Sequence, residues 1–262
     1  MRPVKGSGHL PFSSRRALVT LRDEFKQRKI GKTGGSFRRM LPLDAPSGPQ
    51  WVESELEANA VIQIAFVPTF YDLITQPIIK YEICDRKHVY TPDIACIFGQ
   101  NRDPFPGRFL IEVKRRDELK RKLPEFADRF HAAREFCADM GAAFRVLHED
   151  HLQTAYLKNA LLLRRDMNED PDLHASDLLK SEFGERSFTK RDAEEALGPM
   201  IRQAWERTQT VRRLIAWREL ACDLMLDLTD DSELRIPSDD VSNAPRDPFL
   251  KMLQDMDSEV NI

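Results

Sequence analysis

The sequence predicts an α/β fold in which a mixed sheet flanked by helices is followed by a mainly helical C-terminal part. Three observations support this prediction. Short apolar runs typical of strands are concentrated between residues 76 and 147, helical patterns border them, and after residue 152 the chain reads as a series of helices. With 262 residues, 41% of them hydrophobic, the chain can bury a substantial core and is long enough for two domains.

The first elements are a predicted helix and a predicted hairpin. In residues 51–67 apolar side chains recur every fourth residue, and the proline that follows predicts the end of this helix. Residues 76–83 and 88–98 are rich in β-branched and aromatic side chains and flank a polar turn, which predicts two paired strands. Residues 99–107 are rich in Gly, Pro, Asn and Asp, so we expect a loop there.

A strand, a helix and another strand are predicted after this loop. Residues 108–114 form a short apolar run typical of a strand. Residues 124–140 carry one apolar stripe at helical spacing, and Gly141 is a suitable end for this helix. Residues 142–147 predict the last strand of the unit. The order helix, three strands, helix and strand describes one compact α/β unit.

The remaining elements are short helices separated by Gly and Pro residues. Thr189 and Asp192 have the spacing of a capping box at the start of one of them. Residues 234–237 can form a small strand. Several short helices and a strand are compatible with a winged-helix module, but equally with a helical bundle that does not bind DNA.

These patterns divide the chain into four predicted segments. The first is a basic N-terminal leader, the second the α/β domain, the third a helical domain compatible with a winged helix, and the fourth an acidic tail. Their expected boundaries are residues 1–48, 49–152, 153–237 and 238–262.

The net charge of −3 conceals a strong asymmetry between the two ends of the sequence. Residues 1–40 carry eleven Lys or Arg against two acids, whereas residues 227–262 carry ten acids against three bases. The basic segment is suited to contact phosphates, although a solvated tail would have the same composition. The acidic segment disfavours contact with DNA.

Composition also indicates where the protein resides. The N-terminal residues lack the apolar run of a signal peptide, and no stretch approaches the roughly 18 apolar residues that a membrane-spanning helix needs. The cysteines are scattered without a CxxC pair, which favours reduced thiols over disulfides or a zinc site. We therefore expect a cytoplasmic protein that does not bind membranes. The four cysteines are Cys84, Cys96, Cys137 and Cys222.

Two adjacent apolar runs contain the charged residues that suggest chemistry. TPDIACIF (91–98) contains Asp93, and FLIEVK (109–114) contains Glu112 and Lys114. Alternation along a strand places Glu112 and Lys114 on the same face. Charged groups on a buried strand are costly unless they are paired or bind a metal, so this pattern requires an explanation. An ordinary ion pair on an edge strand is the simplest one.

Two carboxylates and an ammonium also suit phosphodiester hydrolysis. Asp93, Glu112 and the carbonyl of Val113 would supply oxygen ligands to Mg²⁺, and Mn²⁺ should be able to substitute. Such a metal polarises the scissile phosphate and activates water. Lys114 would orient or help to deprotonate the attacking water and offset the charge that develops on phosphorus.

The helix predicted upstream supplies another acid. Glu57 borders the apolar stripe of this helix, so its carboxylate can lean toward the metal. Glu55 points elsewhere and is expected to be solvated. Glu53 lies one turn before Glu57 and is the strongest competing choice.

Together these motifs resemble the TnsA endonuclease subunit of heteromeric transposons, within the PD-(D/E)xK superfamily. The resemblance covers about residues 50–150. It implies a restriction-endonuclease-like core with Mg²⁺ as cofactor. It is carried by SELE (54–57), QPIIKYE (76–82), YTPDIACIF (90–98) and FLIEVK (109–114).

The resemblance also implies which residues form the active site. Glu57, Asp93, Glu112 and Lys114 take the positions of the family's catalytic residues, and Glu149 in HEDHL is a candidate further acid. Some family members have Gln where this chain has Glu112. The glutamate matches the general nuclease pattern better, so the difference does not argue against activity.

The activity that the resemblance implies is one step of cut-and-paste transposition. TnsA-like proteins cut the non-transferred strand at the 5′ ends of the transposon. A TnsB-like DDE transposase processes the 3′ ends, and a TnsC-like AAA+ ATPase binds the C-terminal domain of the TnsA-like subunit. The expected partners are therefore double-stranded DNA and these two proteins.

Two other functions are compatible with the residues. A stand-alone restriction or repair nuclease would use the same chemistry and would cut DNA without partners. A catalytically silent, DNA-bound adaptor would keep the fold without activity, and the presence of all four predicted site residues disfavours it.

Overall fold

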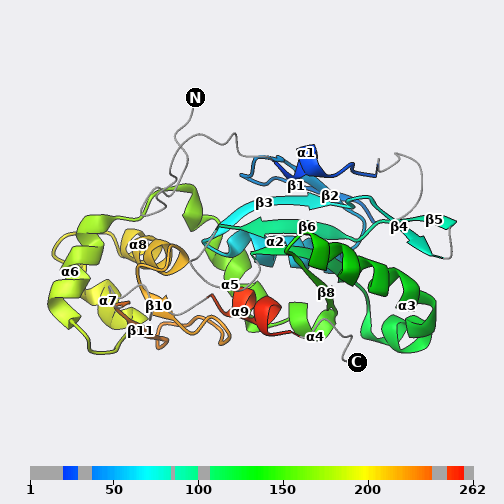
Figure 1. Ribbon diagram of the computed structural model, residues 1–262. Coiled ribbons are helices and arrows are strands. Elements are labelled where there is room, and N and C mark those ends of the chain that lie inside the picture. The colour runs from blue at the N-terminus through cyan, green and yellow to red at the C-terminus, as the bar shows by residue number, and fades with distance from the viewer. Residues whose placement is uncertain (1–19, 29–36, 84–85, 100–106, 238–246, 257–262) are drawn as a thin grey trace. The chain divides into compact units, whose positions relative to one another are not determined.

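The computed structural model describes five segments of the chain, which Figure 1 draws in colour. Within the described residues, the sheet unit comprises 20–28, 37–83, 86–99, 107–157 and 248–256, and the helical unit comprises 158–237 and 247. Three predicted features lie partly outside the described residues: the loop at 99–107, the hairpin turn and the two charged terminal segments. The described residues are 20–28, 37–83, 86–99, 107–237 and 247–256.

A four-stranded mixed sheet forms the centre of the sheet unit, as the sequence predicts (Figure 1). Strand β6 (Ile94–Phe98) is antiparallel to both β3 (Phe70–Thr75) and β7 (Arg108–Val113), whereas β8 (Ala143–Leu147) is parallel to β7. The parallel pair requires a crossover connection, which helix α3 (Arg116–Asp139) provides.

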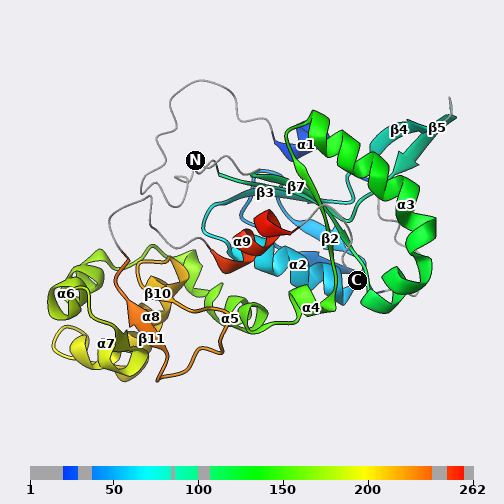
Figure 2. The same cartoon turned by 60° about the horizontal axis from the view of Figure 1, so that its bottom comes forward.

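Both faces of this sheet are buried. On one face, Leu110 of β7 packs in a core cluster with Phe126, Phe130 and other side chains of α3. Phe109 and Ile111 of β7 point the opposite way and are also buried. Helix α2 (Glu55–Phe66) contacts β3 and β7, and Figure 2 shows the sheet unit from a second direction.

Smaller elements surround the central sheet. Strands β4 and β5 pair as an antiparallel ribbon, and β1 pairs with β2. Helices α1 and α4 each have four residues. Their bounds are β1 Arg39–Leu41, β2 Gln50–Val52, β4 Ile79–Ile83, β5 Arg86–Tyr90, α1 Leu21–Glu24 and α4 Glu149–Leu152.

The strand predicted over residues 88–98 is in fact two strands in different sheets. The chain bends at Thr91–Asp93, so β5 belongs to the ribbon and β6 to the central sheet. Pro92 lacks the N–H that a continuous strand would need for pairing. The partner of β6 is β3, which the sequence pattern did not predict because the buried Asp72 interrupts its apolar residues.

Two helix boundaries also differ from the prediction. Helix α2 begins at Glu55 rather than at residue 51, because the Ser54 hydroxyl caps it and the preceding residues form β2. Helix α3 begins at Arg116, eight residues before Pro124. The proline therefore lies inside the helix, and the buried Leu119 shows that the preceding turns already pack on the core.

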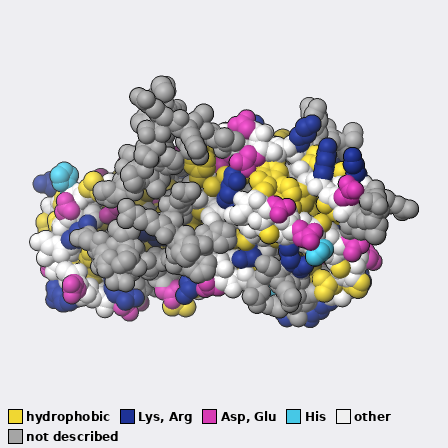
Figure 3. Space-filling model, in the orientation of Figure 1, with side chains coloured by type: hydrophobic (Ala, Val, Ile, Leu, Met, Phe, Trp, Pro, Cys, Tyr) yellow, Lys and Arg dark blue, Asp and Glu magenta, His cyan; other side chains and the backbone are white. Residues whose placement is uncertain are grey.

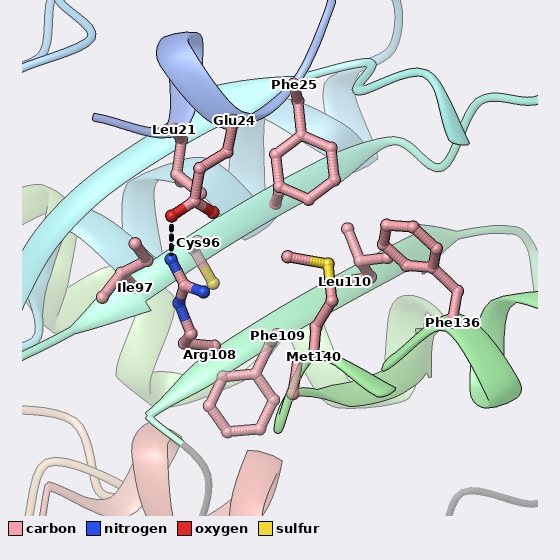
Figure 4. Close-up of a pocket in the computed structure, with 12 residues that line it drawn as sticks. Leu21, Glu24, Phe25, Cys96, Ile97, Arg108, Phe109, Leu110, Phe136 and Met140 are labelled. Atoms are coloured by element: carbon pink, nitrogen blue, oxygen red, sulfur yellow. Dashed lines mark hydrogen bonds and ion pairs between the residues drawn. The ribbon is translucent and has the colours of Figure 1, made fainter. Parts of the chain in front are cut away.

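The described part of the predicted leader packs on the sheet unit (Figure 4). Glu24 of α1 pairs with Arg108 of β7, and the ring of Phe25 lies 6.1 Å from that of Phe136. The backbone N–H of Leu21 donates to Asp72 at 2.9 Å, which satisfies a carboxylate that is fully buried. A hollow of about 20 Å³ remains beneath this segment and is mostly apolar.

The helical unit combines helices with a small antiparallel sheet in the order β10-β11-β9. The Thr189 hydroxyl and the Asp192 side chain form the predicted capping box at the start of α7. The small sheet is compatible with a winged-helix module, which stays a prediction. The elements are α5 Ala155–Leu163, which begins in the sheet unit, η1 Asp166–Asn168, α6 Leu173–Phe183, β9 Phe188–Thr189, α7 Lys190–Ala196, α8 Ala204–Ala216, β10 Ala221–Cys222 and β11 Glu233–Arg235.

The last helix, α9 (Pro248–Asp255), returns to the sheet unit. Its apolar face is buried, and the Phe249 ring stacks on Tyr156 at 5.6 Å. Arg145 of β8 donates through Nε to the carbonyl of Leu253 at 2.6 Å, which places a cation at the negative end of the helix. This helix, which lies in the predicted acidic tail, therefore docks on its own chain.

The surface of the described residues carries charges of both signs (Figure 3). On the face in Figure 3, Lys and Arg side chains are interspersed with Asp and Glu, with apolar side chains between them. Within the described part of the chain, no helix is long and apolar enough to cross a membrane. Cys96, Cys137 and Cys222 are free thiols, and Cys84 lies outside the described residues.

Candidate active site

The two sequence motifs meet at one end of the central sheet. Asp93 immediately precedes β6, whereas Glu112 and Val113 are the last two residues of β7 and Lys114 follows them. Because β6 and β7 are antiparallel, with Ile94 opposite Ile111, the start of one strand lies beside the end of the other. Asp93 and Glu112, which are 19 positions apart in the sequence, are thereby brought to the same ammonium group.

Three of the oxygens predicted to bind a metal surround the ammonium of Lys114. Its Nζ lies 2.7 Å from Oε1 of Glu112 and 3.2 Å from Oδ2 of Asp93. It also donates to the carbonyl oxygen of Val113 at 3.1 Å. The structure therefore contains a cation-binding cluster of two carboxylates and one backbone carbonyl, with the lysine ammonium as its cation.

The Asp93 carboxylate is held in place by the backbone. The N–H of Val113 donates to Oδ2 of Asp93 at 2.7 Å. This oxygen is also the one near Lys114, while the described residues place no hydrogen bond on Oδ1. The bend at Pro92 turns the side chain of Asp93 toward β7, so this residue ties the two strands together and leaves one oxygen for a ligand.

Tyr90 is a further member of the cluster that sequence reasoning missed. Its hydroxyl donates to Oε2 of Glu112 at 2.6 Å, and the side chain is buried. Tyr90 ends β5, three residues before Asp93, and its apolar environment resembles that of an ordinary core tyrosine. The proximity of Tyr90 to the PD motif was the one available signal, and it does not indicate which way the ring points.

Burial and mutual charge set the ionisation of the cluster. Burial raises the pKa of the Glu112 carboxyl to about 7, and the charge of Asp93 adds to this shift. Burial also raises the pKa of Asp93, against the opposing effect of the Lys114 ammonium and the Val113 N–H. For Lys114, burial lowers the pKa, but the two carboxylates outweigh it and the net pKa is raised. The lysine therefore stays charged at neutral pH.

Glu57 lies at the edge of this cluster. Burial raises the pKa of its carboxyl, the charge of Asp93 raises it further, and that of Lys114 lowers it. Its two oxygens accept hydrogen bonds from the Ser54 hydroxyl and the Glu53 N–H, both at 2.9 Å. Glu57 therefore also caps the start of α2, and this capping fixes the direction of its carboxylate.

The competing acid, Glu53, is engaged elsewhere. Its carboxylate pairs with Arg28 and accepts a hydrogen bond from the Gln76 side chain at 2.8 Å. The hydrogen bond from Gln76 is the largest cause of a lowered pKa for this carboxyl. Neither acid forms a hydrogen bond or ion pair with Asp93, Glu112 or Lys114 within the described residues. The charges of Asp93 and Lys114 act on the pKa of Glu57, whereas that of Glu53 responds to Gln76 and to arginines, so the electrostatics favour Glu57 for the site.

Glu149 contacts the start of helix α3. Its Oε2 accepts from the backbone N–H of Arg116 at 3.0 Å. Hydrogen bonds from its own backbone N–H and from that of Arg116 lower the pKa of the carboxyl. A carboxylate at this position complements the positive end of the helix. Among the contacts of the described residues, none joins Glu149 to Asp93, Glu112 or Lys114, so the structure gives this acid a capping contact.

The donor set suits a hard divalent cation. Among the described residues, no three His, Cys, Asp or Glu side chains are grouped so as to hold a metal ion by themselves. The converging ligands are instead two carboxylates and the Val113 carbonyl, all oxygens of the kind that Mg²⁺ binds. A metal at this position would have to displace the Lys114 ammonium. The small hollow beneath the N-terminal segment includes none of these residues (Figure 4).

Comparison with known families agrees with this geometry. Residues 59–149 match the family model described as TnsA-like endonuclease N terminal. The matched segment contains Asp93, Glu112 and Lys114, and Glu57 lies two residues before it. No curated protein is similar enough to the chain to count as a match. The resemblance is thus confirmed over this segment, and residues 59–149 form a TnsA-like endonuclease N-terminal domain, which supports a nuclease of the transposase type.

Proposed function

We propose that this chain is the Mg²⁺-dependent DNA endonuclease subunit of a heteromeric transposase and cuts the non-transferred strand at transposon 5′ ends. The observation that carries the proposal is the cluster of Asp93, Glu112 and the Val113 carbonyl around one cation. This cluster lies inside the domain that matches the TnsA-like endonuclease model. An edge-strand ion pair would explain Glu112 with Lys114 but not the convergence of Asp93 and the carbonyl.

In the proposed reaction, Asp93, Glu112 and the Val113 carbonyl hold Mg²⁺, and Mn²⁺ can replace it. The metal supplies polarisation of the scissile phosphate and a lowered pKa for water. Glu57 adds negative charge beside Asp93, which strengthens attraction for the cation.

Lys114 acts as a charged donor in this proposal. A lysine ammonium beside the site is suited to orient the attacking water and to offset charge on the phosphate. A cation held by Asp93 and Glu112 would take the place of the ammonium beside these carboxylates. The Lys114 side chain is 23% exposed, which gives it room to turn toward the substrate.

The partners proposed for this activity are duplex transposon ends, a TnsB-like DDE transposase and a TnsC-like AAA+ ATPase that binds the helical unit. The TnsA-like domain match supports this context. Dependence on a partner would restrain a nuclease that could otherwise cut at random.

The test is nicking of end-labelled transposon-end DNA in Mg²⁺, with and without the cognate transposase. Wild type is compared with Asp93→Asn, which removes one ligand charge, and with Asp117→Asn, which removes an exposed carboxylate of α3 as a control. We expect a 5′-end nick that needs the transposase and Mg²⁺, is lost in Asp93→Asn and persists in Asp117→Asn.

Other outcomes would identify the competing functions. Nicking by wild type without the transposase, still dependent on Asp93, indicates a stand-alone nuclease. Identical behaviour of wild type and Asp93→Asn under every condition would refute the enzymatic function and favour the adaptor.

A further inference from the structure

The two oxygens of Glu112 have different partners. Oε1 lies 2.7 Å from the Lys114 ammonium, in the cluster that also includes Asp93 and the Val113 carbonyl. Oε2 accepts the Tyr90 hydroxyl at 2.6 Å. The carboxylate therefore presents one oxygen to the cation cluster, while its second oxygen is held by a tyrosine.

Tyr90 is firmly placed for this contact. Its side chain is 5% exposed and belongs to the core cluster that includes Ile79 and Phe126. In the ribbon, Tyr90 is paired with Ile79, so the backbone as well as the ring is fixed.

The number of oxygens that a carboxylate offers affects which cation binds. Ca²⁺ takes about six to eight oxygen ligands and accepts both oxygens of one carboxylate, whereas Mg²⁺ requires a near-octahedral arrangement at shorter distances. A carboxylate restricted to one oxygen disfavours Ca²⁺ more than Mg²⁺ or Mn²⁺. The contact between Tyr90 and Oε2 imposes this restriction on Glu112.

We infer that Tyr90 is a metal-selectivity residue, which holds Oε2 of Glu112 away from the cation and so favours Mg²⁺ and Mn²⁺ over Ca²⁺. The inference rests on the proposed function, because it takes Glu112 as a metal ligand. Tyr90 would act through Glu112 without touching the metal or the DNA, so it is a positioning residue.

A purely structural contribution of Tyr90 predicts something different. A buried hydroxyl needs an acceptor, and Glu112 could be no more than that acceptor. Loss of the hydroxyl would then make the Glu112 side chain more mobile and weaken the binding of every cation alike. The selectivity inference instead predicts that the affinity for Ca²⁺ increases relative to the affinity for Mn²⁺, because both oxygens of Glu112 become available.

The experiment measures cation binding by the full chain without DNA. Free Mn²⁺ is followed by electron paramagnetic resonance as it binds, and Ca²⁺ is then added to displace it. Tyr90→Phe removes only the hydroxyl. Tyr81→Phe is the matched control, because Tyr81 lies on the same ribbon and its ring stacks on His88, away from Glu112. Asp93→Asn shows how much of the binding belongs to this site.

We expect Tyr90→Phe to raise the ratio of Ca²⁺ to Mn²⁺ affinity by about tenfold, which is the lower end of the change in metal affinity that follows removal of a ligand's partner. Tyr81→Phe should keep the wild-type ratio. In nicking assays, Tyr90→Phe should be inhibited by correspondingly less Ca²⁺ in the presence of Mg²⁺.

An unchanged ratio in Tyr90→Phe, with or without equal loss of both affinities, would overturn the inference and leave the proposed function intact. If wild type binds neither cation more tightly than Asp93→Asn, the proposed metal site itself is wrong and the inference fails with it.

Discussion

The position of the Lys114 ammonium predicts that removing its charge has opposite effects on metal binding and on DNA nicking. The group lies where the proposed metal ligands converge, 2.7 Å from Glu112 and 3.2 Å from Asp93. A metal must displace it before binding. Lys114→Met keeps the length of the side chain and removes the charge, so it should tighten metal binding while it abolishes nicking.

The size of the effect follows from the charges involved. At an effective dielectric constant of about 20, two unit charges about 3 Å apart attract by roughly 5 kcal/mol. Most of this attraction is regained in wild type, because the partly exposed ammonium can turn to water or to DNA phosphate when displaced. We therefore expect a net gain in Mn²⁺ affinity of about tenfold, or about 1.4 kcal/mol.

The assay is a Mn²⁺ titration of wild type and Lys114→Met at pH 8.5, where protons compete least with the metal for Glu112. Lys122→Met is the control, because Lys122 pairs with Glu118 on the surface of α3 at 3.3 Å. A fall in Mn²⁺ affinity of tenfold or more in Lys114→Met would refute the reasoning, since it would mean that the ammonium helps to build the metal site.

Three further predictions test the ionisation, the fold and the choice of acid. The pKa of Glu112 is raised to about 7 from its ordinary 4.5, so protonation of its carboxyl stabilises the folded state at low pH, and this stabilisation is lost as pH rises between these values. In EDTA, the melting temperature of wild type relative to Glu112→Gln should therefore fall between pH 5 and pH 8. A difference that stays constant with pH would contradict this. Leu253→Ala should lower the free energy of unfolding by about 2–5 kcal/mol in urea denaturation, because Leu253 is fully buried, whereas the exposed Lys251→Ala on the same helix should have little effect. Glu57→Gln should reduce nicking at least tenfold, whereas Glu53→Gln should not. Equal losses of nicking activity in the two variants would mean that both acids only stabilise the fold.

Local sequence patterns determined the chemical groups of the candidate site. Strand alternation placed Glu112 and Lys114 together, and the adjacent apolar run TPDIACIF supplied Asp93 as their partner. The strands β7 and β8 and the capping box at Thr189 were also predicted, because each depends on neighbours within a few residues. Such local signals do not depend on which segments pair with the strand or pack against the sheet.

Tertiary structure decided the contacts that join distant segments. The strand β3 carries a fully buried Asp72 that no local pattern favours. Besides the N–H of the neighbouring Leu73, its carboxylate accepts from the N–H of Leu21 and from the N–H and hydroxyl of Ser47, which come from distant segments and make the burial acceptable. The split of one predicted strand into β5 and β6 likewise depends on the separate partners that each half finds.

The same distinction applies within the site. The sequence by itself determined which carboxylates and which lysine could carry the chemistry. It could not predict that the Tyr90 hydroxyl binds Glu112, because the two residues are 22 positions apart and the direction of a buried ring is set by the packing around it. Residue types and strand periodicity specify the chemical inventory, whereas the closing of the ribbon onto the core decides which oxygen of Glu112 is left for a cation.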